Sequence, residues 1–226
     1  MDNKPGKNDN SDKYSLRSKV FNKIREDILS GVYKENEELK EAAISKKLGV
    51  SRTPVREALR QLELEELVTI IPNKGAYVKS ITTEDIYDIY MIRSYLEGLC
   101  ARWACEKITD EQKNELEEVI FLSEFHISKG HYDKIFELDN RFHMALYEAS
   151  GSRLLTHTLT DFHHYAERIR KNTLASKERA TNASEEHKAI FNAVTGNDPD
   201  LAEKLANEHV VKALENIRTQ GMDNLF

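Results

Sequence analysis

The sequence predicts a mainly α-helical protein with an N-terminal winged helix-turn-helix and a C-terminal all-α antiparallel helical bundle. Two observations lead to this fold class. Three short amphipathic segments are followed by two β-rich segments joined by a turn sequence. Beyond Ser80, apolar residues recur at helical spacing, with no convincing strand. We therefore expect a disordered lead-in over residues 1–13, a winged helix-turn-helix domain over 14–80 and a helical bundle over 81–226.

Composition is that of a soluble globular protein, because 32% of the 226 residues are charged and 39% are hydrophobic. The length is enough for two modest domains. No apolar run approaches the ~20 residues that a membrane-spanning helix needs. The N-terminus is polar and lacks the apolar core of a secretory signal. We therefore expect a cytoplasmic protein without membrane contact, in which Cys100 and Cys105 are reduced thiols.

Charge is divided unevenly along the chain. Residues 1–80 contain 16 Lys and Arg against 13 Asp and Glu, whereas the remainder contains 17 against 26. A basic front and an acidic back indicate two domains with different partners, although charged residues are often only solvated surface.

The N-terminal elements follow from periodicity and turn residues. The first helix is expected from Tyr14 to Leu29, and its apolar residues lie at intervals of four: Leu16, Val20, Ile24 and Ile28. A second helix should run from about Lys40 to Leu48 and end at Gly49, which permits a tight turn. The third should begin after Ser51, a favourable N-cap, and reach about Glu66. The segments "LVTII" and "AYVKS", joined by "PNKG", predict the wing.

The remaining chain predicts six helices. Thr82 with Asp85, and Thr109 with Gln112, have the spacing of capping boxes at two helix starts. The expected helices span about 83–106, 110–129, 132–149, 152–174, 177–195 and 199–219.

The third helix has the pattern of a DNA-recognition helix. Its apolar stripe of Val55, Ala58, Leu59 and Leu62 lies beside a stripe of three arginines, Arg52, Arg56 and Arg60. Arginine can donate two hydrogen bonds to a guanine in the major groove, and the hydroxyls of Ser51 and Thr53 suit phosphates. Lys74, at the tip of the wing, could reach a flanking groove or the backbone. The alternative from periodicity alone is a solvated charged face.

The segments "LGVSRTPVREALRQLELEELV" and "PNKGAYV" closely resemble the DNA-binding domain of the GntR family of bacterial transcription regulators, over about residues 14–80. The resemblance implies that Arg52, Thr53 and Arg56 face double-stranded DNA and that Gly75 shapes the wing. Many members have an arginine in the second helix where this sequence has Ala42. A contact made there would be missing, or supplied by Lys40 or Lys46.

Three later helices turn residues of metal-ligand type towards their apolar stripes. Asp139 and His143 lie one helical turn apart, and His187 and His209 lie on two further helices. Each histidine alone is more simply a core histidine with a hydrogen-bond partner. As a set, one carboxylate and three imidazoles favour a divalent metal, because buried polar groups need partners. The other histidines are expected on helix surfaces: His126, His131, His157, His163 and His164.

Residues 82–220 resemble the FCD effector-binding domain of the FadR-like GntR branch, in its six-helix VanR-type form. The resemblance rests on "RSYLE" (93–97), "DNRFHMALYEASG" (139–151), "SEEHKAIFNAV" (184–194) and "LANEH" (205–209). It implies one divalent ion per chain (Zn, Ni, Mn or Fe), held by Asp139, His143, His187 and His209, beside a small carboxylate effector. Arg93 is the first candidate to bind that effector and Arg168 the second. Arg93 could equally be a structural partner of Glu97.

Three kinds of function are compatible with these residues. The first is a homodimeric transcription regulator, most often a repressor in the resembled family, that binds an inverted-repeat operator and responds to an organic acid. The second is a metal-dependent enzyme with a centre like the two-histidine, one-carboxylate triad. The third is a regulator whose metal is purely structural. We expect the first, because an enzyme does not explain the winged helix and no segment indicates a catalytic base.

Overall fold

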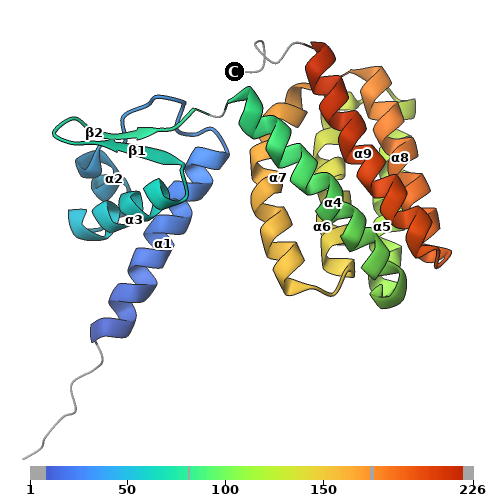
Figure 1. The fold of residues 1–226 in the computed structure, drawn as a ribbon, viewed down its shortest axis with the longest axis horizontal. Coiled ribbons are helices and arrows are strands. Elements are labelled where there is room, and N and C mark those ends of the chain that lie inside the picture. Colours follow the sequence, from blue (N-terminus) through green and yellow to red (C-terminus); the bar gives the residue numbers. More distant parts are fainter. Residues whose placement is uncertain (1–8, 81, 174–175, 221–226) are drawn as a thin grey trace, which may run out of the picture. The chain divides into compact units, whose positions relative to one another are not determined.

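The computed structural model describes residues 9–80, 82–173 and 176–220. The chain divides into two compact units, and the boundary lies between Ile81 and Thr82 (Figure 1). Both units are mostly helical, and the only sheet among the described residues has two strands. None of the described helices combines the length and the apolar character that crossing a lipid bilayer requires.

The first unit has the predicted order of elements. Helices α1 (Asp9–Leu29), α2 (Glu41–Leu48) and α3 (Arg52–Leu64) precede strands β1 (Val68–Ile71) and β2 (Gly75–Val78). The strands are antiparallel, and Val68 pairs with Val78. The wing has an addition that periodicity did not reveal. Glu38 forms a bridge to Tyr77, and the amide of Leu39 donates to the carbonyl of Ala76, so the segment before α2 extends the sheet.

Helix α1 begins earlier than the predicted Tyr14. Its first turn, from Asp9, extends into the segment that we expected to be disordered, and residues 1–8 lie outside the described part of the chain. Val20, Ile24 and Ile28 are buried as predicted, but Leu16 is 42% exposed. The apolar stripe therefore contributes to the core only over the part of α1 that packs against α3.

Helix α3 buries the predicted stripe of Val55, Ala58, Leu59 and Leu62 completely. Gly49 closes α2 with φ of +65°, as expected for a left-handed turn. Ser51 does precede α3, but its hydroxyl makes no capping hydrogen bond, contrary to the prediction. Its side chain is exposed, so this hydroxyl remains accessible to a partner.

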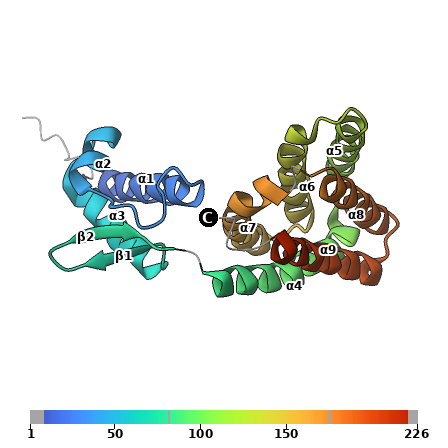
Figure 2. The ribbon, with the colours of Figure 1, turned by 90° about the horizontal axis from the view of Figure 1, so that it is seen from above.

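The second unit is the predicted six-helix antiparallel bundle. Its helices are α4 (Thr83–Lys107), α5 (Asp110–Ser128), α6 (Ile135–Ala149), α7 (Arg153–Thr173), α8 (Lys177–Thr195) and α9 (Pro199–Gln220), with a 3-10 turn at Tyr132–Lys134. Figure 2 shows α6 between α5 and α7. The main core cluster joins residues of α4, α5, α6, α8 and α9, and it includes Phe142, Ile190 and Ala206. These helices bring the candidate ligands together.

Helices α4 and α9 have the most extensive contact of any two described helices. Gly98 permits this approach, since a Cβ atom there would lie 3.0 Å from the carbonyl oxygen of Glu203. The same Cβ atom would lie 3.6 Å from Cβ of Asn207, so the part of α4 next to Glu97 lies against the part of α9 next to His209.

Helices α4 and α5 begin with the predicted capping boxes. The hydroxyl of Thr82 accepts from the amide of Asp85, and the Asp85 carboxylate accepts from the amide of Thr82 at 2.8 Å. Thr109 and Gln112 exchange the same pair of hydrogen bonds at the start of α5. Side chains thus satisfy amides that have no partner within the helix.

We predict that Thr82→Ala lowers the free energy of unfolding of the helical unit by about 1 kcal/mol, because the first turn of α4 loses its side-chain acceptor. Thr82→Ser keeps the hydroxyl and should recover most of the loss. Chemical denaturation followed by circular dichroism measures both variants. Equal stability of wild type and Thr82→Ala would contradict a capping role.

Candidate metal centre and nucleic-acid interface

Helices α6, α8 and α9 bring the four predicted ligands to one buried point. Asp139 and His143 lie one turn apart on α6, His187 lies on α8 and His209 on α9. All four side chains are buried, and one ligand atom from each lies within 4.8 Å of the others. This is the only group of three or more metal-binding side chains found among the described residues.

The distances between the ligand atoms suit a single ion. The Nε2 atom of His209 lies 3.3 Å from Nε2 of His143 and 3.3 Å from Nε2 of His187. Asp139 Oδ1 lies 3.9 Å from His143 Nε2 and 3.7 Å from His187 Nε2. Two ligands each about 2.1 Å from one ion lie roughly 3.0–3.4 Å apart at angles of about 90–109°. The nitrogen spacing matches, and the carboxylate needs only a small movement.

Two carboxylates bind Nδ1 of two of the imidazoles, on the side of each ring that faces away from the other ligands. Nδ1 of His143 lies 2.9 Å from Glu97 Oε2, and Nδ1 of His209 lies 2.7 Å from Glu186 Oε2. A neutral imidazole that donates Nδ1–H to a carboxylate presents the lone pair of Nε2 on its other side. The lone pairs of His143 and His209 then face each other inside the protein. A cation between them removes this repulsion, so the residues fit a divalent metal.

The ionisation of these groups agrees with that assignment. Burial lowers the pKa of His209, although its hydrogen bond to Glu186 opposes the shift. Burial alone would raise the pKa of Glu186, but hydrogen bonds from His209 and Arg179 outweigh it and hold the pKa below its usual value. Burial also opposes ionisation of Glu97, but the charge of Arg93 and the donors around it keep its pKa well below normal. At neutral pH both carboxylates are charged and His209 is neutral.

Phe142 fixes the third ring. It is stacked against His187, with ring centroids 3.9 Å apart and planes 10° from parallel. Phe142 is fully buried, so His187 cannot turn without disturbing the core.

Arg93 is tied to the same site through Glu97. Its Nε and Nη2 atoms donate to Glu97 Oε1 at 3.0 and 2.6 Å, and both side chains are 1% exposed. Tyr147 donates its hydroxyl to the same oxygen at 2.7 Å. Nη1 of Arg93 is buried and has no hydrogen-bond partner among the described residues. Arg93 is therefore a structural partner of Glu97, and it retains one buried donor, Nη1. The side chain of Arg168 lies outside the described residues.

The surface position predicted for His163 is wrong. His163 is 1% exposed, its Nε2 lies 3.0 Å from Asn140 Oδ1, and its ring centroid lies 5.6 Å from that of His143. The spacing of Leu159, His163 and Ala166 on the buried face of α7 could have revealed it. His126, His131 and His157 are exposed or half-buried, and the His164 side chain is not described.

Sequence reasoning also missed the two carboxylates that hold the imidazoles. The sequence indicates Glu97 only as a partner of Arg93, and it gives no role to Glu186. Glu186 directly precedes His187 in the chain, yet it contacts His209 on another helix. Only the packing of α8 on α9 reveals that contact.

The recognition helix presents the predicted polar face. Arg52, Thr53, Arg56 and Arg60 are exposed, opposite the buried apolar stripe of α3. Lys74 and Gly75 are exposed in the wing. Gly75 has φ of +125°, and a Cβ atom there would lie 3.2 Å from Glu38 Oε1. The wing turn therefore strongly favours glycine.

Arg56 has a partner that the sequence did not indicate. Its Nε and Nη2 atoms donate to the two carboxylate oxygens of Glu41, at 2.8 and 2.7 Å. Glu41 is the first residue of α2, so the pair joins the two helices of the helix-turn-helix. It fixes the direction of the Arg56 guanidinium. Ala42, Lys40 and Lys46 are exposed nearby, and Lys40 lies 3.6 Å from Glu38 Oε2.

A winged helix with exposed arginines on α3, joined to a helical unit with a buried cluster of one aspartate and three histidines, is typical of a DNA-binding regulator. Residues 16–78 match the family model of bacterial regulatory proteins of the gntR family, and residues 88–212 match the FCD domain. The chain belongs to the GntR family and is a DNA-binding transcription regulator with an FCD domain. Because this family consists of transcription regulators, the enzyme alternative is excluded.

Curated relatives agree over nearly the whole chain. The chain is 27% identical to the HTH-type transcriptional repressor RspR of Escherichia coli (strain K12), over 92% of each protein. It is 29% identical to the HTH-type transcriptional regulator YdhC of Bacillus subtilis (strain 168), over 90% of this chain and 93% of the relative. The solved structure of E. coli McbR/YncC has the same fold, with a TM-score of 0.70 and 21% identity over 91% of this chain and 98% of that one.

We predict that Arg93→Met lowers the stability of the helical unit by about 3–5 kcal/mol, because the Glu97 charge stays buried without its main partner. The double variant Arg93→Met with Glu97→Gln should cost less than the sum of the two single variants. Chemical denaturation measures this cycle.

Arg102→Met is the matched control on the same helix. Arg102 pairs with Asp200 and Glu203, but its side chain is 37% exposed, so its loss should cost less than about 1 kcal/mol. If Arg93→Met and Arg102→Met lower the free energy of unfolding equally, the buried Arg93–Glu97 pair contributes no more to stability than an exposed ion pair.

Proposed function

We propose that this regulator is a homodimeric, cytoplasmic repressor that binds an inverted-repeat operator and responds to a small carboxylate effector held beside a divalent metal. The observation that carries the metal-binding part is that the side chains of Asp139, His143, His187 and His209 come together at one buried point. The repressor assignment is supported by the similarity to RspR, which is named a repressor.

DNA binding would use the exposed face of α3 and the wing. Arg52 and Arg56 would read base edges, because arginine can pair with guanine through two donors. Ser51, Thr53 and Arg60 would contact phosphates, and Lys74 would reach the flanking DNA from the turn that Gly75 shapes. Glu41 would orient Arg56 before DNA arrives. Two such units related by a two-fold axis would match an inverted repeat.

The metal would be held by one carboxylate and three imidazoles, a set that suits Zn, Ni, Mn or Fe. A divalent ion there supplies a positive charge that attracts an organic carboxylate. Arg93 supports this class of effector, since Nη1 is a buried donor that has no partner in the described part of the chain, while Nε and Nη2 are held by Glu97. Arg168 is proposed as a second effector contact.

Effector binding would change DNA affinity only if the effector prefers one arrangement of the two units. A purely structural metal is the second candidate, and the complete burial of its four ligands favours it. The two candidates differ in whether an organic acid binds more tightly when metal is present.

We predict that Arg56→Ala weakens binding to the operator by about 1–3 kcal/mol if Arg56 reads a base. The operator is first selected from random duplexes with the wild-type protein, and fluorescence anisotropy then measures affinity. Affinity for an unrelated duplex should fall much less. An operator affinity equal to that of the wild type, in a folded variant, would remove Arg56 from the interface.

We predict that the purified protein binds about one divalent ion per chain and that the variant His187→Ala with His209→Ala loses it. Elemental analysis measures the metal content. His157→Ala is the control, because its side chain is 77% exposed and lies outside the site. A wild-type protein that carries no metal and shows no thermal shift with Zn or Ni would falsify the metal site.

The same samples distinguish the two roles of the metal. A set of small organic acids is screened by thermal shift against the metal-loaded and the metal-free protein. The sensory role predicts an acid that stabilises the metal-loaded form more strongly, since binding to the native state raises its stability. If no acid in the set stabilises the metal-loaded form more strongly than the metal-free form, the result would support a purely structural metal.

A further inference from the structure

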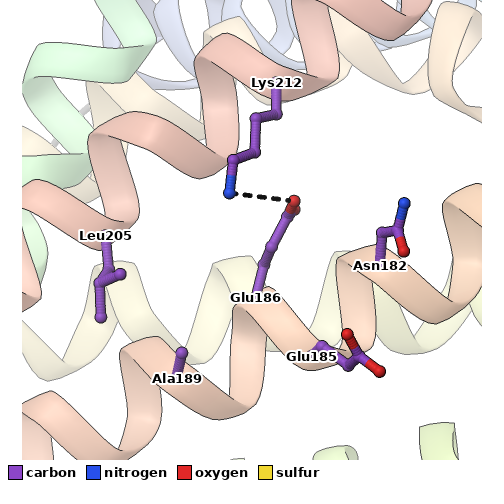
Figure 3. Close-up of a pocket in the computed structure, with 6 residues that line it drawn as sticks. All are labelled: Asn182, Glu185, Glu186, Ala189, Leu205 and Lys212. Carbon is purple, nitrogen blue, oxygen red and sulfur yellow. Dashed lines mark ion pairs between the residues drawn. The ribbon is translucent and has the colours of Figure 1, made fainter.

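Glu186 lies between the buried metal ligands and the surface. It lines a pocket of about 410 Å³ between α8 and α9, and its side chain is 14% exposed. Figure 3 shows the lining residues, with Glu186 directed across the pocket towards Lys212 on α9. The pocket is lined by Asn182, Glu185, Glu186, Ala189, Leu205 and Lys212.

The two carboxylate oxygens of Glu186 have different partners. Oε2 accepts from His209 Nδ1 at 2.7 Å and from Arg179 Nη1 at 3.0 Å. Oε1 faces the Nζ atom of Lys212 at 3.7 Å, in the pocket. Since Lys212 is 53% exposed and the separation is long, this outer ion pair is weak. The strong contacts of Glu186 point inward, towards His209.

Glu97 holds Nδ1 of His143 in the same way, but its side chain is fully buried. Its other oxygen is occupied by Arg93 and Tyr147, so solvent has no access to it. Glu186 is therefore the more accessible of the two carboxylates that hold ligand imidazoles. A change at the surface between α8 and α9 can reach His209 through this one side chain.

We propose that Glu186 is a positioning residue for the metal: it keeps the proton of His209 on Nδ1, so that Nε2 is presented to the ion. Arg179, which lies two turns earlier on α8, holds the carboxylate in place. Carboxylates behind metal-binding histidines fix the tautomer and increase the basicity of the ligand nitrogen. The pocket in Figure 3 is then the place on the surface from which metal affinity can be altered. This inference rests on the proposed metal binding.

Glu185 provides a matched control. It is the adjacent residue, it lines the same pocket and it is exposed, so Glu185→Ala makes the same change in charge and size without touching His209. Glu186→Ala removes the acceptor, whereas Glu186→Gln leaves a neutral acceptor of the same length.

The first measurement uses metal-free protein with ¹⁵N-labelled histidine. Ring nitrogen chemical shifts in NMR report which nitrogen of His209 is protonated. Wild type and Glu185→Ala should have the proton on Nδ1, and Glu186→Ala should move it towards Nε2. A wild-type His209 with its proton on Nε2, or no change in Glu186→Ala, would overturn the proposal.

The second measurement is metal affinity for Zn by competition with a chelator. Glu186→Ala should bind Zn about 10–100-fold more weakly than wild type. Glu186→Gln should lie between them, and Glu185→Ala should match wild type. Equal weakening in Glu185→Ala and Glu186→Ala would contradict positioning, because the effect would come from the charge of the pocket alone.

The two measurements separate this inference from the proposed function. If the wild-type protein binds no metal, the metal part of the proposed function fails. The tautomer of His209 in the metal-free protein still decides whether Glu186 positions the ring. If Glu186→Ala fails to fold, Glu186→Met, which keeps the length of the side chain but has no oxygen acceptor, provides both readouts.

Discussion

The carboxylate of Glu97 is buried almost completely, and a buried charge is tolerated only where opposite charge and hydrogen-bond donors surround it. Arg93 supplies the opposite charge from the preceding turn of the same helix, and Tyr147 and His143 supply donors from α6. This requirement fixes the position of α6 against α4. It also orients the ring of His143, so the interaction that stabilises the helical core arranges part of the candidate metal site as well.

In the candidate site, the outer groups hold the rings of the inner histidines by hydrogen bonds and by stacking. Glu97 and Glu186 bind the outer nitrogens of His143 and His209, and Phe142 holds the ring of His187 by stacking. The inner nitrogens are left facing each other across distances that suit a shared ion. Metal binding would therefore need little reorganisation of the rings. Such preorganisation lowers the cost of binding.

In the winged-helix unit, a carboxylate also orients a functional side chain, but at the surface. Arg56 is held by both oxygens of Glu41, so its guanidinium points in a defined direction although it is exposed. A carboxylate next to an arginine that is proposed to read a base would also compete with DNA for it. In that proposal, one ion pair would both orient Arg56 and limit its affinity for DNA. In each unit, a carboxylate sets the direction of a side chain that would bind a ligand.

The sequence by itself determined the helices, the wing, the capping boxes and which face of α3, α6, α8 and α9 turns inward, because these follow from local spacing and local hydrogen bonds. It therefore indicated Asp139, His143, His187 and His209. It could not indicate that Glu97 holds His143, that Glu186 holds His209 or that Glu41 holds Arg56. The Glu97–His143 contact spans 46 positions, and the His143–His209 contact spans 66. Such contacts depend on the packing of whole helices, which only the tertiary structure decides.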